Sequence, residues 1–429
     1  MTAIVTVYFN GAPVDVTAFV RSVSIRRGRS RELDRFSTGT ATVVFNNEDR
    51  RFDPLYSAGP YFGQIRPRLR VSVVRDEISL FDGLIEDWNL DYSLSGKSDA
   101  SISCVDGLAL LAQTALDEFT NAQQTPAERI ASVVTRPEVA YPGSTDFDPG
   151  FNVMQGDTVS ANTDTLGYLD KVVATDLGRL FVDGAGVLRY RDRTSGITSS
   201  PQVVFASESD PYVQQLSVLS GATLWFDAAS PSPLRVDDDA KAQLILQDAV
   251  LWFDASDPDY IAPVVPFSDI AVELGSEFLY NRIQITRAGG VVQVSVDDAS
   301  VTTYGVRTYS ADGLLFLGDS ETLEFADFLA SLYSQPDVRI AGHTVLLHGL
   351  DTTTRRYMQR LEIGDVVRTV WAPNNVGQAF DSLSLVEGIE HAIAVDTHTL
   401  KVQLTPFSAE GFILDDLNRG LLDTSELTY

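Results

Sequence analysis

Apolar and polar positions alternate along the first hundred residues, which is the pattern of half-buried β-strands. Val5, Val7 and Phe9 alternate with less apolar neighbours, and the dipeptide Asn10-Gly11 that follows is typical of a hairpin turn with positive φ. The alternation continues to about residue 105 with few helical signals. Many short strands with few helices indicate a small β-domain, and we expect a barrel-like domain over residues 1–106.

Helical spacing begins after residue 106 and predicts an inserted α+β domain over residues 107–200. Thr125-Pro-Ala-Glu128 is a capping box with Pro at the first helical position, so a helix is expected to start there. The apolar spacing of residues 166–177 is also helical, and Gly178 is the expected C-terminal cap. Gly83 interrupts a strand pattern and is expected at a β-bulge.

Residues 266–410 return to alternating patterns and predict a second barrel-like domain. One helix is expected within it, from about residue 320 to 334, and Pro336 prevents its continuation. The predicted fold class is therefore mainly β with an α+β insertion. It comprises two small β-barrel-like domains and a helix-containing inserted domain.

A repeated motif lies between the inserted domain and the second β-domain. Leu224-Trp-Phe-Asp-Ala228 recurs as Leu251-Trp-Phe-Asp-Ala255, so residues 201–265 are interpreted as a connector that carries this insertion. The two copies are interpreted either as equivalent strands of a small β element or as a host-facing decoration that presents Trp225 and Trp252. Residues 411–429 are an acidic C-terminal tail.

The charge of this 429-residue chain is large and unevenly distributed. The net charge is −27, which argues against nucleic-acid binding, because phosphate neutralisation needs a basic face. Residues 1–75 hold twelve Arg and six acidic residues, a net charge of +6, which leaves −33 for the rest. This asymmetry indicates a surface complementary to another protein or another copy of the chain. The alternative is an acidic surface that only maintains solubility.

No motif in the chain indicates catalysis, a cofactor or a metal. Cys104 is the only cysteine, which excludes an internal disulfide and a multi-cysteine zinc site. No histidine pair has metal-ligand spacing in a helix, and neither a nucleophile elbow nor a phosphate-binding loop is present. No apolar run is long enough to span a membrane. We therefore expect a protein that is not an enzyme and that binds no cofactor or metal.

The long loop at residues 46–70 is the strongest candidate for an interaction site. It joins two predicted strands without secondary structure of its own, and such loops are usually functional. Its aromatic and Arg side chains are typical anchors of protein interfaces. The candidate assembly residues are Arg50, Arg51, Phe52, Tyr56, Tyr61, Phe62, Arg66 and Arg68. The alternative is a loop that folds back over its own domain.

Several blocks, taken in order, give the chain a family resemblance. They are Arg51-Phe-Asp-Pro54 with Gly59-Pro-Tyr61 and Arg66-Pro67, Leu80-Phe-Asp-Gly-Leu-Ile-Glu-Asp-Trp88 with Cys104-Val-Asp-Gly-Leu-Ala109, Leu166-Gly-Tyr-Leu169 with Gly178-Arg-Leu-Phe-Val-Asp183, Leu279-Tyr-Asn-Arg-Ile-Gln-Ile-Thr286, and Leu361-Glu-Ile-Gly-Asp-Val366 with Gly388-Ile-Glu-His391. With this order of blocks the chain resembles the minor tail proteins, or baseplate hub proteins, at the tail tip of siphovirus-type phages.

The resemblance implies a structural virion protein, made in the host cytoplasm and located at the tail tip. It implies a homotrimer whose two barrel-like domains per chain present six similar faces to the sixfold tail tube. The expected partners are other copies of the chain, the tail tube, distal tail proteins and other tip proteins. The bias of 28 Arg against 4 Lys indicates a GC-rich, actinobacterial host.

Three alternatives to the hub remain open. The first is a component of a hexameric distal-tail ring. The second is a protein that binds a host receptor or carbohydrate through residues 220–265. The third is a cell-wall hydrolase.

Overall fold

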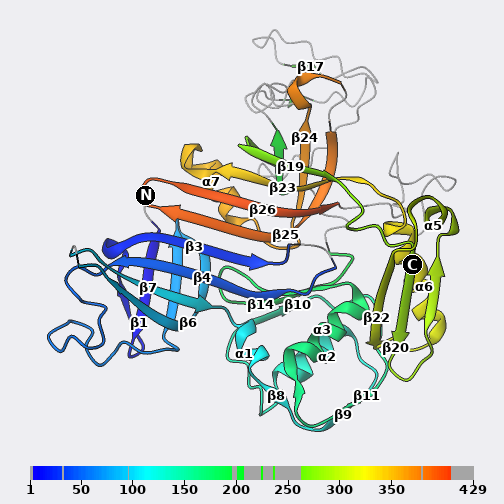
Figure 1. Ribbon diagram of the computed structural model, residues 1–429, viewed down its shortest axis with the longest axis horizontal. Coiled ribbons are helices and arrows are strands. Elements are labelled where there is room, and N and C mark those ends of the chain that lie inside the picture. Colours follow the sequence, from blue (N-terminus) through cyan, green and yellow to red (C-terminus); the bar gives the residue numbers. More distant parts are fainter. Residues whose placement is uncertain are drawn as a thin grey trace.

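The fold is mainly β, as the sequence predicts (Figure 1). The computed structural model describes residues 3–30, 33–94, 96–195, 201–206, 224–225, 235–236, 262–377 and 380–406. Within these ranges, no helix is long and apolar enough to cross a lipid bilayer.

One continuous sheet of fourteen strands runs through the described part of the molecule. Its order is β18-β15-β24-β25-β3-β4-β7-β6-β5-β1-β2, and β26, β23 and β19 branch from β25. The strands are β1 (Ile4–Phe9), β2 (Ala12–Asp15), β3 (Val20–Gly28), β4 (Ser37–Asn46), β5 (Arg70–Arg75), β6 (Ile78–Tyr92), β7 (Ser98–Val105), β15 (Val203–Ala206), β18 (Val264–Val265), β19 (Asp269–Leu274), β23 (Val338–Leu346), β24 (Val366–Trp371), β25 (Phe380–Ala394) and β26 (His398–Pro406).

The pairing of β3 with β25 joins the N-terminal and C-terminal halves of the chain. The two strands run antiparallel, with Gly28 opposite Gly388 at one end and Ser22 opposite Ala394 at the other. Two separate barrel-like domains are therefore not confirmed, and no closed barrel forms among the described strands. The domain boundaries proposed from the sequence remain predictions.

Two hydrophobic cores lie on either side of the β3–β25 pairing. The first is built from the N-terminal strands and contains Phe45 and Ile102. The second contains Phe205 and also the side chains of β23 to β26 and of helix α7 (Thr352–Arg360). Ile393 of β25 packs in the first core, and Phe36 from the N-terminal half packs in the second. Each half of the chain thus completes the core of the other.

The helices that follow β7 lie below the large sheet in Figure 1. They are α1 (Leu108–Ala112), α2 (Pro126–Val134) and α3 (Thr165–Asp176). The short strands of this segment pair as β8 (Ala115–Leu116) with β12 (Thr163–Asp164), as β9 (Phe119–Asn121) with β11 (Asp157–Val159), and as β10 (Thr145–Phe147), β14 (Leu188–Arg191) and β13 (Arg179–Val182) in one sheet. The capping box is confirmed, because Thr125 and Glu128 exchange side-chain and backbone hydrogen bonds at the start of α2.

Two glycines have roles other than those predicted. Gly83 is not at a bulge, because it pairs regularly with Val71. A Cβ atom on Gly83 would lie 2.3 Å from the Val105 carbonyl oxygen, so close packing of strands explains this glycine. Gly178 does not adopt the left-handed conformation that ends α3. Leu177 does so instead, with φ of 51°.

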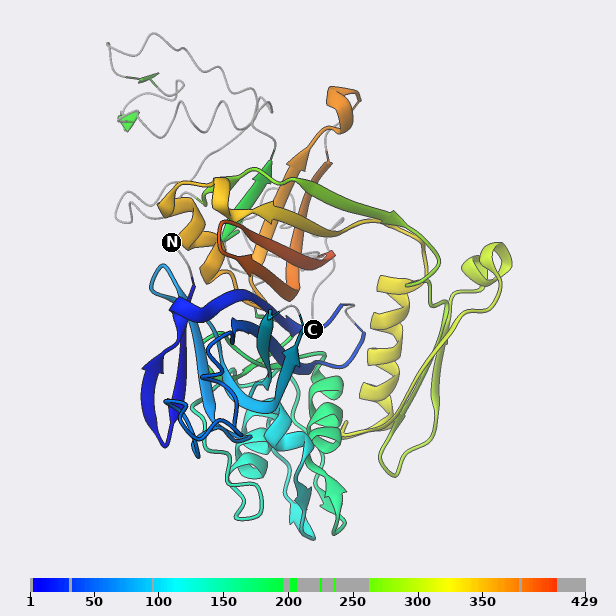
Figure 2. The same ribbon diagram turned by 60° about the vertical axis from the view of Figure 1, so that its left-hand side comes forward.

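Residues 276–334 form a further α/β unit that the sequence did not separate from the second β-domain. The unit contains β20 (Arg282–Arg287), β21 (Gln293–Val296), β22 (Thr308–Leu314), α5 (Asp298–Tyr304) and α6 (Asp319–Tyr333). The predicted helix at 320–334 is confirmed as α6, and its apolar face covers Ile283 and Ile285 of β20. The antiparallel strands β19 and β23 connect this unit to the large sheet (Figure 2).

The repeated motif is described only in part. Leu224 and Trp225 form strand β16 (Leu224–Trp225), which pairs antiparallel with β17 (Arg235–Val236). The second copy of the motif, including Trp252, lies outside the described residues, and so does the tail at 411–429. The role of Trp225 and Trp252 remains a prediction.

Candidate assembly surface

The loop between β4 and β5 is anchored to its own domain by an aromatic stack. Phe52 is fully buried, and its ring centroid lies 4.6 Å from that of Phe45 and 5.6 Å from that of Tyr61. The Tyr61 ring in turn stacks on Phe9 at 4.4 Å. The prediction that Phe52 contacts a neighbouring subunit is therefore wrong, because its side chain fills the protein's own core. Tyr61 also serves this internal stack.

Two of the predicted loop arginines have partners within the loop and the adjoining strands. Arg50 donates to Asp53 at 2.6 Å and lies over the Tyr56 ring, with 5.1 Å between its guanidinium carbon and the ring centroid. Asp53 is buried and also accepts a hydrogen bond of 2.7 Å from the Tyr92 hydroxyl. Arg51 pairs with Asp49 and covers the Phe19 ring. These contacts hold the loop in one conformation.

The remaining candidate residues face solvent. The Phe62 side chain is 50% exposed, and Leu55, which the sequence analysis did not select, is 84% exposed. Arg66 and Arg68 are also exposed, and within the described ranges neither has an ion-pair partner. We call Leu55, Phe62, Arg66 and Arg68 the loop surface.

Hydrogen bonds to their backbone groups position Arg66 and Arg68. The Trp88 indole N–H donates to the Arg66 carbonyl oxygen at 3.1 Å, and the Arg68 N–H donates to the Ile85 carbonyl oxygen at 2.6 Å. Arg68 has a φ of 67°, a left-handed conformation that the surrounding contacts maintain. The loop surface therefore presents two cations and two apolar groups from a well-packed backbone, as interfaces with specific partners require.

A buried ionic cluster connects the three parts of the chain, and the sequence analysis missed it. Glu387 of β25 is 1% exposed and pairs with Arg29, which follows β3, at 2.6 Å and with Arg179 of β13 at 3.0 Å. Burial alone would raise the pKa of Glu387, but the charges of Arg179 and Arg29 outweigh burial and lower it. Nearby, Arg27 of β3 pairs with Glu362 at 2.6 Å. The Arg29, Arg179 and Glu387 side chains are buried, and their ion pairs hold the parts of the fold together.

A second contact ties the β5–β6 turn to helix α7. Asp76 and Glu77 in this turn both have positive φ, of 49° and 69°. The Asp76 carboxylate is buried and accepts from Arg355 at 2.7 Å and from Gln359 at 3.2 Å. The strained turn is therefore held by the half of the chain on which it docks.

Three of the four histidines are buried. His391 Nδ1 and His398 Nε2 are 3.0 Å apart in the core, and His343 Nε2 lies 2.8 Å from the Thr369 hydroxyl. His348 is exposed. Among the residues that the structure describes, no three His, Cys, Asp or Glu side chains are grouped to hold a metal ion.

We expect His343 to make stability depend on pH between about 6.5 and 3. Burial lowers the pKa of His343 from 6.5 to about 3, so the unfolded chain binds a proton that the folded chain does not. The contribution of neutral His343 to the free energy of unfolding is complete above pH 6.5. It falls by about 1.4 kcal/mol for each pH unit below that value. Urea unfolding of wild type and His343→Phe should show a stability difference that falls by about 2 kcal/mol from pH 7 to pH 5.

Comparison of the same two proteins at pH 7.5 and 8.5 provides the control, because there the difference should be constant. Phe is suited to the site, since His343 stacks on Phe205 at 4.3 Å between ring centroids. A difference that stays constant from pH 7 to pH 5 would contradict the assignment.

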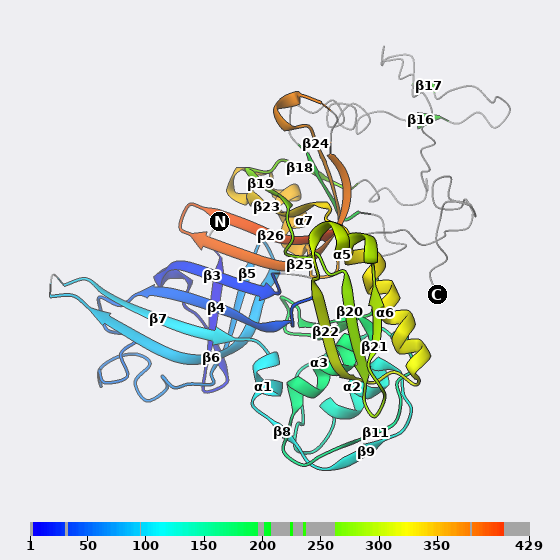
Figure 3. The ribbon, with the colours of Figure 1, turned by 45° about the vertical axis from the view of Figure 1, so that its right-hand side comes forward.

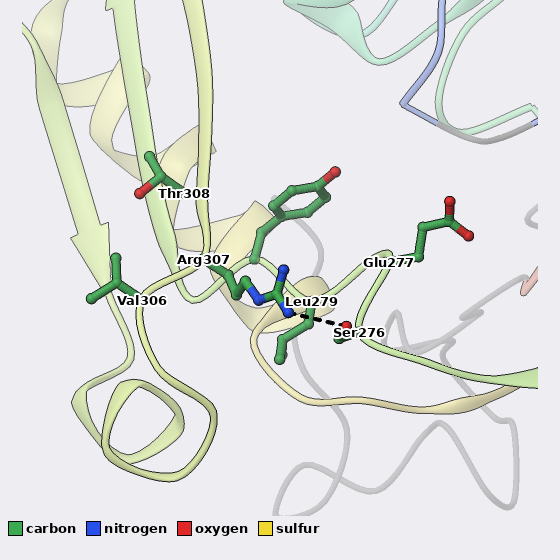
Figure 4. Close-up of a pocket in the computed structure, with 7 residues that line it drawn as sticks. Ser276, Glu277, Leu279, Val306, Arg307 and Thr308 are labelled. Atoms are coloured by element: carbon green, nitrogen blue, oxygen red, sulfur yellow. Dashed lines mark hydrogen bonds between the residues drawn. The ribbon is translucent and has the colours of Figure 1, made fainter.

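An open pocket of about 630 Å³ lies at one end of the β20–β22 sheet (Figure 4). Its walls are formed by Ser276, Glu277, Leu279, Tyr280, Val306, Arg307 and Thr308. Arg307 donates to the Ser276 hydroxyl at 3.2 Å. The pocket contains one carboxylate and one guanidinium, and neither a histidine nor a cysteine lines it. It therefore lacks the nucleophile–base arrangement that acyl-transfer catalysis uses.

Comparisons with known proteins place this fold. No family model matches the chain, and no protein with a curated description matches it. Among solved structures, it is similar to the tail protein from Neisseria meningitidis MC58, with a TM-score of 0.57 and 11% identity, covering 94% of this chain and 96% of that one. It is also similar to the 43 kDa tail protein of prophage MuSo2 from Shewanella oneidensis, with a TM-score of 0.56 and 12% identity, covering 95% and 98%. Over nearly its whole length, this chain therefore has the fold of these two tail proteins.

Proposed function

We propose that this chain is a structural protein of a phage tail, and that three copies form the hub that joins the tail tube to the tip. The observation that carries the proposal is the fold, which matches two tail proteins over almost the full length of each partner. A shared insertion or a single β-domain would explain only part of that coverage.

The organisation of the chain supports an adaptor role. Its two halves are joined through β3 and β25, and the inserted unit is tied to both by the ion pairs of Glu387. A chain whose parts are joined in this way transmits force from one neighbouring protein to the next as a single unit. Open strand edges at β2 and at β21 suit contacts with other chains. The location that we propose is the tail tip of the virion, in a siphovirus-type phage of an actinobacterial host.

We also propose that the chain is not an enzyme. The residues that line the open pocket supply no nucleophile–base pair, and the buried Glu387 cluster is closed to solvent.

The mass of the purified protein in solution tests the hub. The chain has a mass of 46.8 kDa, so native mass spectrometry at micromolar concentration should show a complex of about three times that mass. A sixfold complex would favour a distal-tail ring instead. A stable monomer that binds neither itself nor the tail tube protein would contradict the proposal.

A further inference from the structure

Exposed apolar side chains are concentrated in and beside the α/β unit of residues 276–334. Of the 22 large apolar side chains that are exposed in the described part of the chain, 12 lie between Val272 and Val338. A cluster of exposed apolar side chains usually marks a binding site for another protein, whereas single exposed apolar residues are ordinary. The question is therefore which partner covers it.

Strand β21 and the residues just before it carry four of these exposed apolar side chains. Ile283 and Ile285 of β20 face α6, and their cross-strand neighbours Ser295 and Gln293 share that face. Val294 and Val296 consequently point to the opposite, uncovered face. Val291 and Val292 extend it into the preceding turn.

Strand β21 is also an edge. It pairs only with β20 within the described part of the chain, so the backbone groups on its other side are open to a neighbour. The surface thus offers apolar side chains and an unpaired strand edge together, which is typical of a contact between subunits.

The unit that carries these valines is acidic. Residues 276–334 contain eight Asp or Glu and three Arg, a net charge of −5. Asp298, at the start of α5, and Asp312, on β22, are exposed, and neither has an ion-pair partner in the described ranges. Asp312 alternates with Ala311, which packs toward the core, so Asp312 faces away from α6. We call Val291, Val292, Val294, Val296, Asp298 and Asp312 the β21 surface.

The loop surface has the complementary chemistry. Leu55 and Phe62 are apolar, Arg66 and Arg68 are unpaired cations within the described ranges, and residues 1–75 carry a net charge of +6. Both views in Figures 1 and 3 place the loop between β4 and β5 at the opposite end of the molecule from β20, β21 and β22. One copy therefore cannot bring its own two surfaces together, but two copies can.

We propose that the loop surface of one copy packs on the β21 surface of the next copy. This inference rests on the proposed trimer and names the contact that builds it. Two loop surfaces placed face to face would bring four arginines together, and two β21 surfaces would bring four aspartates together. Repulsion between like charges therefore disfavours an isologous pairing. A contact between two different surfaces repeats from copy to copy and closes into a ring when its rotation fits.

Charge reversal followed by charge exchange tests this contact in the full chain. The double variant Arg66→Glu/Arg68→Glu should weaken association by about 10- to 100-fold, because it faces acidic residues with acidic residues. Adding Asp298→Arg/Asp312→Arg to the same chain restores opposite charges at every contact and should restore the trimer. Analytical ultracentrifugation over a range of protein concentrations measures both effects.

Three further variants separate a lost contact from a lost fold. Val294→Lys should also weaken the trimer, because it places a charge at the apolar centre of the β21 surface. Arg360→Glu and Val395→Lys alter exposed residues outside both surfaces and should leave the trimer unchanged. Circular dichroism should give the same thermal midpoint for every monomeric variant to within a few degrees.

The outcomes distinguish the contact from the trimer itself. A wild type that is monomeric overturns the proposed hub. A trimeric wild type that withstands the double arginine variant and Val294→Lys overturns this contact and leaves the hub in place. If the double arginine variant stays trimeric but its tails fail to assemble, the loop surface contacts another tail protein. That result also overturns the inference.

Discussion

Replacement of Glu387 with Gln should lower the free energy of unfolding by about 3–5 kcal/mol. The substitution keeps the shape of the side chain but removes the carboxylate that pairs with both Arg29 and Arg179. Both guanidinium groups are nearly buried, so each would lose its ion pair with Glu387 in a medium that solvates a charge poorly. Urea unfolding at pH 7 and fixed protein concentration measures the loss.

Glu390 provides a matched control for this experiment on the same strand. It pairs with Arg26 at 3.3 Å, and both side chains are partly exposed, at 32% and 58%. Exposed pairs of this kind contribute about 0–1 kcal/mol, so Glu390→Gln should change stability by less than about 1 kcal/mol. Equal effects of the two substitutions would show that burial of the Glu387 pairs does not matter.

Replacement of Gly28 with Ala should lower the free energy of unfolding by about 2–5 kcal/mol. Gly28 has a φ of +89°, and a Cβ atom there would lie 2.2 Å from the Glu387 carbonyl oxygen and 2.8 Å from the Gly388 Cα atom. Both neighbours are backbone atoms of β25, so neither can rotate away. The two strands that join the halves of the chain would have to separate locally. The midpoint of urea unfolding reports this loss.

Gly11 separates the cost of backbone strain from the cost of the steric clash. It has a similar φ of +84°, but nothing lies within 4 Å of an added Cβ atom. Gly11→Ala should therefore cost only the strain, about 1–2 kcal/mol. If Gly28→Ala lowers the free energy of unfolding by no more than Gly11→Ala does, the close approach of β3 and β25 does not require glycine at position 28.

Local features of the fold follow directly from the sequence. The capping box at Thr125 begins α2, the apolar spacing near residue 325 forms α6, and Asn10-Gly11 adopts the positive φ angles of 51° and 84° that its turn requires. Each depends on residues within one or two turns of chain. Short-range hydrogen bonds and side-chain periodicity are sufficient to determine them.

Long-range pairing does not follow in the same way. Alternation predicts that β3 and β25 are strands, but it contains no information on which strands are partners. Their pairing joins residues about 360 positions apart and converts two expected barrels into one continuous sheet. Gly28 and Gly388 also owe their roles to backbones that approach from distant segments.

The sequence indicated which loop to consider as a contact site, but not which of its side chains are exposed. The choice of the loop between β4 and β5 rested on its aromatic and Arg residues, and its role in assembly remains a prediction. Residue type does not reveal which side of a loop faces inward, and Phe52 and Tyr61 turned to the core, whereas Phe62, Arg66 and Arg68 turned to solvent. Leu55 was missed because an exposed leucine has no signature of its own.

The sequence by itself determined many of the strands, the capped start of α2, the uneven charge and the long loop between β4 and β5, because each of these is encoded by neighbouring residues. Only the tertiary structure decided that Glu387 pairs with two distant arginines, that the two halves share one sheet, and that the β21 surface and the loop surface lie at opposite ends of the molecule. These features arise when segments far apart in the chain exclude water from one another, and packing in three dimensions selects such partners.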